Sequence, residues 1–318
     1  MFGASCEIIR VTVGVRLEKL VFGVLGMPVC AKLGDVKIGD GCPVRIMGVI
    51  NVSPESFYKG SVTTQIDVIR RCAEAMVADG AAIIDVGAMS TAPYLSTQIS
   101  LKEEIHRLKT AVRVINDTVH LPISVDTTRA AAAASAIKMG AKIINDVTGL
   151  KGDPQMAKVI AKHDVSTILM AHDPKDSRRN DPITRIKIAL AESLNLSHNA
   201  GIDIEKIAVD PGLGFFRKDG KGIGFSPTKN LPWYVWDCTV IRDIGKLNDL
   251  GRPLCVSASR KSFIGKILGH KRPEDRLIGS LAAAAIATFN GVHLIRTHDV
   301  GESVEAVRMA ENIRRLGV

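Results

Sequence analysis

Polar side chains follow one short apolar run after another along this sequence, and their types suit a charged, nitrogen-rich ligand. Carboxylate and amide groups at Asp126, Asn145 and Asp210 could pair with the edge of a guanidine-like heterocycle. Lys261 and Arg296 could hold phosphates or pair with those carboxylates. Other polar residues in equivalent positions are Asn51, Asp85, Ser90, Thr91, Asp146, His172, Ser259, Arg260 and His298.

The same set of residues contains no obvious nucleophile beside a base. Neither a Ser-His-Asp arrangement nor a Cys-His pair is apparent, and no two acids are clearly assigned to glycoside cleavage. A single aspartate at the end of a strand is usually structural, because it caps a helix or pairs with a neighbour. That explanation is much weaker when every strand ends in polar groups. The pattern therefore favours binding and electrostatic catalysis over covalent catalysis.

The elements that position these residues alternate between short β-branched runs and amphipathic segments. The runs are almost continuously apolar, as expected for parallel strands that are buried on both faces. Eight such pairs predict a single-domain (β/α)₈ TIM barrel, in which the active site lies at the carboxyl ends of the strands. We expect strands at 45–51, 82–86, 122–126, 143–146, 165–170, 207–210, 253–257 and 291–296, and helices at 62–79, 101–117, 129–139, 154–162, 183–200, 235–250, 276–289 and 303–315.

An open doubly wound sheet is the alternative fold, but it normally has fewer strands and a glycine-rich phosphate loop. The sequence contains neither a Gly-x-Gly-x-x-Gly motif nor a Walker loop. Turn residues at Gly34–Asp35 and Asp40–Gly41 predict a hairpin that covers the bottom of the barrel. We assign residues 1–31 to an N-terminal extension, of which 1–26 are expected to add little to function, and residues 32–318 to the barrel.

Charge and composition narrow the class of partner. The formal net charge of +9 fits an anionic partner or simply a solvated basic surface. Nucleic acid is not expected, because basic residues are not clustered with aromatics and no known binding module occurs. No membrane span is expected, because no run of 18 uncharged apolar residues occurs. Six scattered cysteines without metal-ligand spacing fit a reducing cytoplasm.

A series of motifs runs from about Arg45 to the end of the chain. In order they are IMGVINVSPESF (46–57), DVGAMSTAP (85–93), SVDTTRAAAAASAIKMGAKIINDVTG (124–149), ILMAHD (168–173), DPGLGF (210–215), SRKSFIG (259–265) and IRTHDV (295–300). In these motifs the sequence resembles the dihydropteroate synthase family. The resemblance implies a pterin-binding TIM barrel that joins 6-hydroxymethyl-7,8-dihydropterin diphosphate to p-aminobenzoate and releases diphosphate. It also implies a homodimer.

The resemblance also assigns roles to individual residues. It implies that Asp126, Lys261, Arg296 and His298 are catalytic, with Arg296 and His298 holding the leaving diphosphate. Asn51 matches the position that helps to hold Mg²⁺ with that diphosphate. The positions implied to contact the pterin are Asp126, Asn145, Met170, Asp210 and Lys261, and those near the diphosphate or the aromatic amine are Thr91, Phe215 and Ser262.

Two segments depart from the family pattern and leave the acceptor open. Ala92 stands where familiar bacterial members have an arginine, and the loop at 217–236 is long and carries Arg217, Lys218, Lys221, Lys229 and both tryptophans. Both features would suit a bulkier anionic acceptor, 4-(ribofuranosyl)aminobenzene 5′-phosphate, which archaeal relatives use on the route to tetrahydromethanopterin. A pterin-dependent methyltransferase and a pterin-binding protein without turnover are further alternatives, although a methyltransferase would not need the SRKSFIG motif.

Overall fold

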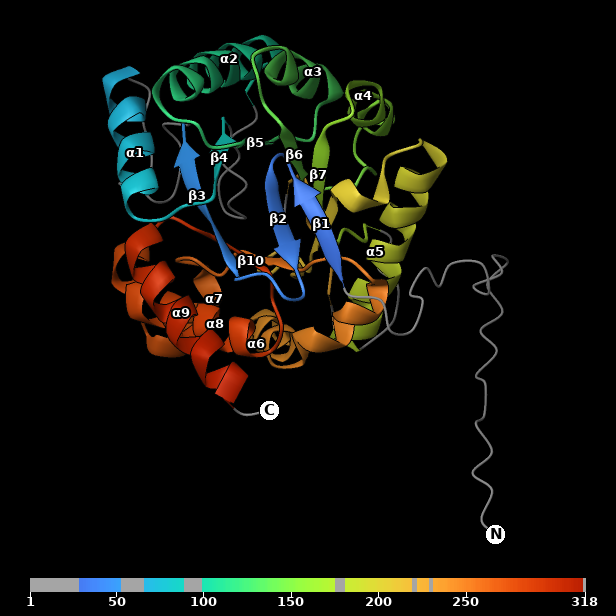
Figure 1. Ribbon diagram of the computed structural model, residues 1–318. Helices are drawn as coiled ribbons and strands as arrows, with labels where there is room; N and C mark the ends of the chain where they lie inside the picture. The colour runs from blue at the N-terminus through green and yellow to red at the C-terminus, as the bar shows by residue number, and fades with distance from the viewer. Residues whose placement is uncertain are drawn as a thin grey trace.

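The computed structural model describes residues 29–52, 66–88, 99–174, 181–218, 222–228 and 231–316. Within these ranges eight parallel strands form one sheet in the order β8-β7-β6-β5-β4-β3-β10-β9. A parallel bridge between Val209 and Leu254 joins the two edge strands, so the sheet closes into a barrel. Helices surround this barrel (Figure 1). The closure confirms the predicted (β/α)₈ TIM barrel and excludes the open doubly wound sheet.

Each barrel strand is followed by at least one helix. The strands are β3 (Arg45–Asn51), β4 (Ile83–Gly87), β5 (Ile123–Asp126), β6 (Ile143–Asp146), β7 (Ser166–Met170), β8 (Ile207–Asp210), β9 (Cys255–Val256) and β10 (Leu294–Thr297). The helices are α1 (Ile66–Ala78), α2 (Leu101–Thr118), α3 (Ala130–Lys138), α4 (Met156–His163), α5 (Pro182–Asn199), α6 (Trp233–Asp243), α7 (Ser262–Leu268), α8 (Leu277–Phe289) and α9 (Val300–Leu316).

The core explains the nearly continuous apolar runs of the sequence. Every residue of β4 and of β6 is buried, because one face of each strand fills the barrel and the other packs against helices. The alanines of α3 allow close approach to the sheet, and Ala132, Ala133 and Ala136 have no exposed surface. No helix in the described ranges is long and apolar enough to cross a membrane.

The segment between β8 and β10 differs most from the predicted elements. The predicted helix at 235–250 is α6 followed by a 3₁₀ helix at Ile244–Leu250, and the predicted strand at 253–257 is only the two-residue β9. Pro253 shortens that strand because it has no backbone N–H. Helix α7 was not predicted, since it contains Gly265 and ends after seven residues at Gly269, whose φ is 73°.

The predicted hairpin is confirmed. Strands β1 (Cys30–Leu33) and β2 (Val36–Gly39) pair antiparallel and cross one end of the barrel (Figure 1). Buried Ala31, Leu33 and Ile38 pack against side chains from the first three residues of the barrel strands, among them Met47, Ile83, Ile143, Ile168, Ala208, Cys255 and Leu294. The hairpin therefore closes the amino end of the barrel. Strand β1 begins at Cys30, two residues before the predicted start of the barrel domain.

We expect the hairpin to be part of the cooperative core. Leu33 is fully buried, so Leu33→Ala should lower the free energy of unfolding by about 2–5 kcal/mol through lost burial and a residual cavity. Leu196→Ala on α5 is the matched control, because Leu196 is 40% exposed and its change should stay below about 1 kcal/mol. Urea denaturation followed by circular dichroism measures both. Equal, small effects would show that the hairpin does not stabilise the barrel.

Candidate active site

The residues predicted to line a pterin pocket lie at the carboxyl ends of neighbouring strands. Asp126 on β5 is in register with Asn145 on β6, and Met170 on β7 is in register with Asp210 on β8. Asn145, Met170 and Asp210 are buried. These ends face away from the hairpin, so the predicted residues gather at the open mouth of the barrel.

Arg296 on β10 connects two carboxylates across this mouth. Its Nε donates to Oδ2 of Asp85 at 2.7 Å, and its Nη2 donates to Oδ2 of Asp126 at 3.1 Å. Burial acts to lower the pKa of Arg296, but the two carboxylates outweigh it and raise the pKa, so the guanidinium stays charged. Asn145 Nδ2 donates to the same Asp85 oxygen at 3.3 Å. Asp85 ends a predicted strand but is not among the predicted site residues; its importance comes from this long-range pairing.

Lys261 and Asp210 are a second pair of opposite charges at the mouth, close enough for each to shift the pKa of the other. Lys261 Nζ donates to the carbonyl oxygen of Leu213 at 2.5 Å and lies 4.7 Å from the centre of the Phe215 ring. Phe215 stacks on Phe225 with ring centres 5.1 Å apart, and both rings belong to one apolar cluster with Met170. Burial lowers the pKa of Lys261 to about 8, although Asp210 and another buried carboxylate oppose the shift.

His298, after β10, lies next to Asn51, which ends β3. Nε2 of His298 is 3.5 Å from Asn51 Nδ2, and its Nδ1 is 3.0 Å from Oγ of Ser259, a residue without a predicted role. Burial, assisted by the nearby cation of Arg296, lowers the pKa of His298 to about 3. The imidazole is therefore neutral at physiological pH. It can offer an anion a hydrogen bond but no charge.

Ser262, the first residue of α7, lies beside a cation from the loop after β8. Nη2 of Arg217 hydrogen-bonds to Ser262 Oγ, and Arg217 Nε donates to the carbonyl oxygen of Gly214 at 2.8 Å. The Arg217 guanidinium also stacks 4.0 Å from the centre of the Trp233 ring. Arg217, one of the cations of the loop at 217–236, therefore lies next to the site.

Other parts of that loop differ from expectation. Trp233 and Trp236 belong to helix α6 rather than to a loop, and Trp236 is buried with its ring 4.9 Å from that of Phe216. Its apolar surface therefore stabilises the core. Lys221 and Lys229 lie outside the described residues, as do Thr91 and the rest of the second loop.

Asp146 shows that not every polar strand end serves the site. Its Oδ1 accepts the N–H of Thr148 at 2.8 Å, and its Oδ2 accepts the N–H of Leu150 at 2.9 Å. Both oxygens of this carboxylate therefore accept hydrogen bonds within the turn after β6. Its neighbour Asn145 is the residue of this strand end that contributes to the mouth.

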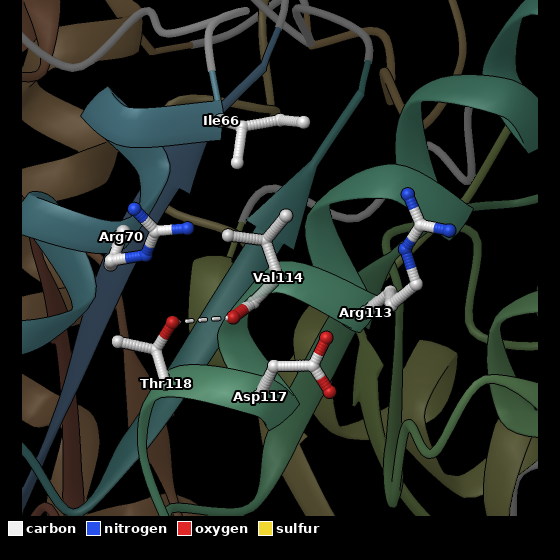
Figure 2. Close-up of a pocket in the computed structure, with 6 residues that line it drawn as sticks. All are labelled: Ile66, Arg70, Arg113, Val114, Asp117 and Thr118. Atoms are coloured by element: carbon white, nitrogen blue, oxygen red, sulfur yellow. Dashed lines mark hydrogen bonds between the residues drawn. The ribbon is translucent and has the colours of Figure 1, made fainter.

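A separate pocket lies outside the barrel, between α1 and α2 (Figure 2). It is lined by Ile66, Arg70, Arg113, Val114, Asp117 and Thr118. The hydroxyl of Thr118 donates to the carbonyl oxygen of Val114, and Arg70 pairs with Asp67. Its α2 residues come from the second half of that helix, which runs back from the catalytic rim, so this pocket is not part of the site.

The fold and the site together define a class of protein. This is a (β/α)₈ barrel that presents buried carboxylates, an amide and a lysine around an apolar wall, which suits a nitrogen heterocycle. The model of the pterin binding enzyme family matches residues 47–298. Among curated proteins, the dihydropteroate synthase of Bacillus subtilis is 34% identical over 272 residues, which cover 86% of this chain and 89% of that enzyme.

Solved structures give the same result. The dihydropteroate synthase of Coxiella burnetii in complex with pteroic acid has a TM-score of 0.75 and 30% identity, covering 90% of this chain and 99% of that one. The Xanthomonas albilineans enzyme with 4-aminobenzoic acid has a TM-score of 0.77 and 28% identity, covering 91% of this chain and 99% of that one. The present chain therefore belongs to the pterin-binding enzyme family, and within it is a transferase of the dihydropteroate synthase type.

Two of the buried ionisable groups at the mouth of the barrel, Asp126 and Lys261, predict a bell-shaped pH dependence of kcat/KM. Burial raises the pKa of Asp126 to about 7, opposed by Arg296, so the carboxylate is lost below that pH. Lys261 loses its charge above about pH 8. Activity at saturating acceptor should therefore rise through pH 7 and fall beyond pH 8.

Lys261→Arg provides the control for this profile. Arginine stays charged throughout the range, so the alkaline fall should disappear even where the overall rate is lower. An alkaline fall that survives in Lys261→Arg would show that another group causes it.

Proposed function

We propose that the enzyme joins 6-hydroxymethyl-7,8-dihydropterin diphosphate to p-aminobenzoate and releases diphosphate. The observation that carries this proposal is the set of Asp126, Asn145, Asp210 and Lys261 around the apolar wall of Met170 and Phe215. The similar solved structures hold pteroic acid and 4-aminobenzoic acid, which supports the same two ligands here.

Each group of the pocket has a role that follows from its chemistry. Asp126, Asn145 and Asp210 accept and donate hydrogen bonds along the polar edge of the pterin, and Phe215 and Met170 cover its faces. Carboxylates beside the ring also stabilise the positive charge that develops when the exocyclic C–O bond breaks. The electron pair of that bond leaves with the diphosphate, and the amine nitrogen then attacks the carbon and loses a proton.

The leaving diphosphate contacts the side of the mouth formed by Asn51, His298 and Arg296. The guanidinium of Arg296 already faces two carboxylates, and His298 is neutral, so these residues offer directional hydrogen bonds more than net positive charge. Among the described residues no cluster of three acidic, histidine or cysteine side chains could hold a metal by itself.

These observations fit a Mg²⁺ ion that is held mainly by the diphosphate. Mg²⁺ commonly uses one or two protein oxygens together with substrate phosphates and water, and the amide oxygen of Asn51 is a suitable protein ligand. When bound, the ion would neutralise charge on the leaving group. The protein's own part is to orient the diphosphate through His298 and Arg296.

The acceptor is expected on the side of Ser262 and Arg217. The Arg217 guanidinium is held against Trp233 and beside Ser262, where it can attract the carboxylate of p-aminobenzoate. The same cation would suit the phosphate of 4-(ribofuranosyl)aminobenzene 5′-phosphate. The structures that hold 4-aminobenzoic acid and pteroic acid favour the simpler acceptor.

Diphosphate release in the presence of Mg²⁺ tests the function directly. We expect release with p-aminobenzoate, none with the ribosylated phosphate, and loss of release on adding EDTA. Arg217→Ala should raise KM for p-aminobenzoate about tenfold with little change in kcat, because it removes a charged hydrogen bond that is made in ground and transition states alike.

Lys218→Ala is the matched control, because Lys218 is the adjacent cation and is exposed. It should leave KM unchanged. Release only with the ribosylated phosphate would replace p-aminobenzoate as the acceptor. Pterin binding without release on either acceptor would contradict the proposed catalysis.

We further propose that the enzyme is a homodimer. We also propose that it works in the cytoplasm, because its scattered cysteines fit a reducing compartment. Helices α7, α8 and α9 lie side by side (Figure 1) and carry most of the large apolar residues that are exposed in the described chain. Large apolar side chains that are exposed together on neighbouring helices often belong to a protein interface. The residues are Ile267, Leu268, Ile278, Ile286, Phe289, Met309, Ile313 and Leu316.

Sedimentation velocity should therefore show a dimer. Ile278 is 81% exposed, so it contributes little to the core of the single chain. Ile278→Asp should therefore convert the dimer to a folded monomer. Any fall in the midpoint of thermal unfolding should be no larger than the loss of the dimer accounts for. Ile204→Asp, at a site that is 40% exposed in the 3₁₀ helix before β8, should leave the sedimentation coefficient unchanged. A wild-type monomer at micromolar concentration would contradict the dimer.

A further inference from the structure

We propose that Asp237 is a positioning residue for Lys261, acting through the peptide bond between Leu213 and Gly214. This inference rests on the proposed pterin-binding role of Lys261 and extends it to a residue on helix α6. Asp237 does not reach the pocket itself. It accepts the N–H of the same peptide group whose carbonyl oxygen accepts a hydrogen bond from Lys261.

The contacts define this arrangement. Oδ1 of Asp237 accepts the N–H of Gly214 at 2.8 Å, and the carbonyl oxygen of Leu213 accepts Nζ of Lys261 at 2.5 Å. The carbonyl of Leu213 and the N–H of Gly214 belong to one planar peptide group. An anion therefore binds the positive end of the peptide dipole while a cation binds its negative end. Each bond strengthens the other, because both polarise the peptide in the same sense.

The loop is built for this contact. Gly212 and Gly214 have φ angles of 77° and 80°, which side chains other than glycine rarely adopt. A Cβ atom at Gly214 would lie 3.2 Å from Cδ of Lys261, so the lysine stem runs along the open face of this glycine. Arg217 Nε holds the next carbonyl, that of Gly214, at 2.8 Å. Successive polar groups of the DPGLGF segment are thus fixed by Asp237 of α6, by Lys261 before α7 and by Arg217 of the same loop.

The burial of Asp237 argues against a purely structural role. Its side chain has no exposed surface, and Oδ2 has no hydrogen-bond partner within the described part of the chain. A neutral asparagine would accept the Gly214 N–H as well, without the penalty of a buried charge. The carboxylate is useful because it keeps Lys261 protonated together with Asp210, whereas burial, Arg296 and Arg217 oppose protonation.

The charge of Asp237 itself depends on pH. Burial raises the pKa of Asp237 to about 7, opposed by the Gly214 hydrogen bond and by the cations of Lys261 and Arg217. The thiols of Cys238 and Cys255 also lie near these charges, but burial raises the pKa of both, so they stay neutral. Asp237 is therefore largely charged at pH 8 and loses much of its charge at pH 6.

Asp237→Asn tests the role of this charge with pteroic acid as the probe. The variant keeps the acceptor for Gly214 but should lower the pKa of Lys261 by about one unit, because one of its two anions is gone. Pteroic acid should then bind about fivefold more weakly at pH 8, with almost no difference at pH 6. The alkaline fall of kcat/KM should move down by the same amount. Isothermal titration calorimetry and the pH profile measure these effects.

Two further variants separate positioning from folding. Asp237→Leu removes the oxygen that accepts the Gly214 N–H, so it should weaken the binding of pteroic acid at both pH values. The matched control is Asp243→Asn, because Asp243 lies on the same helix and pairs with Arg242 and Lys246. It should change neither the affinity for pteroic acid nor its pH dependence. The amide resonance of Gly214 should shift in Asp237→Asn while the remaining spectrum shows a folded protein.

The outcomes distinguish this inference from the proposed function. If the wild-type enzyme does not bind pteroic acid, the proposed function fails. If it binds, but Asp237→Asn binds with the wild-type affinity and pH dependence, the positioning role of Asp237 alone is overturned.

Discussion

The buried ionic bridge of Arg296 with Asp85 and Asp126 is the interaction on which the site depends. It connects β10, β4 and β5 at the mouth of the barrel. Taking a guanidinium and two carboxylates out of water is unfavourable, and their mutual attraction offsets this only when the geometry is good. Removing Arg296 would leave Asp85, which is fully buried, beside a second carboxylate and without a cation. The orientation of Asp126, and of Asn145 through Asp85, follows from this bridge.

The charges at the mouth of the barrel suit the cationic pterin of the proposed function better than a free anion. The carboxylates of Asp85, Asp126 and Asp210 face the cations of Arg296 and Lys261, and His298 is neutral. In a poorly hydrated site these fixed charges act strongly and need no reorganisation as the reaction proceeds. The same balance leaves little net positive charge for an anionic leaving group.

The loop after β8 is held by Lys261 and Arg217, the two cations that we propose contact the two substrates. Its glycines allow a tight path in which the backbone is held by Lys261 on one side and by Arg217 on the other. In the proposed function Lys261 contacts the pterin, and Arg217, which contacts Ser262, contacts the acceptor. A displacement of this loop would therefore affect both substrates. The same segment is followed by α6, whose buried Trp236 anchors it to the core through Phe216.

The sequence alone determined the barrel, the hairpin and the residues of the mouth. Apolar periodicity marks the strands, and because parallel strands point the same way, polar residues at their ends must meet at one rim. The tertiary structure decided which of them pair and which are charged. Asp85 and Arg296 are 211 residues apart, so only barrel closure brings them together. His298 is neutral because it is buried, and Asp237 reaches the Gly214 N–H from helix α6; both depend on packing between distant elements and leave no local pattern in the sequence.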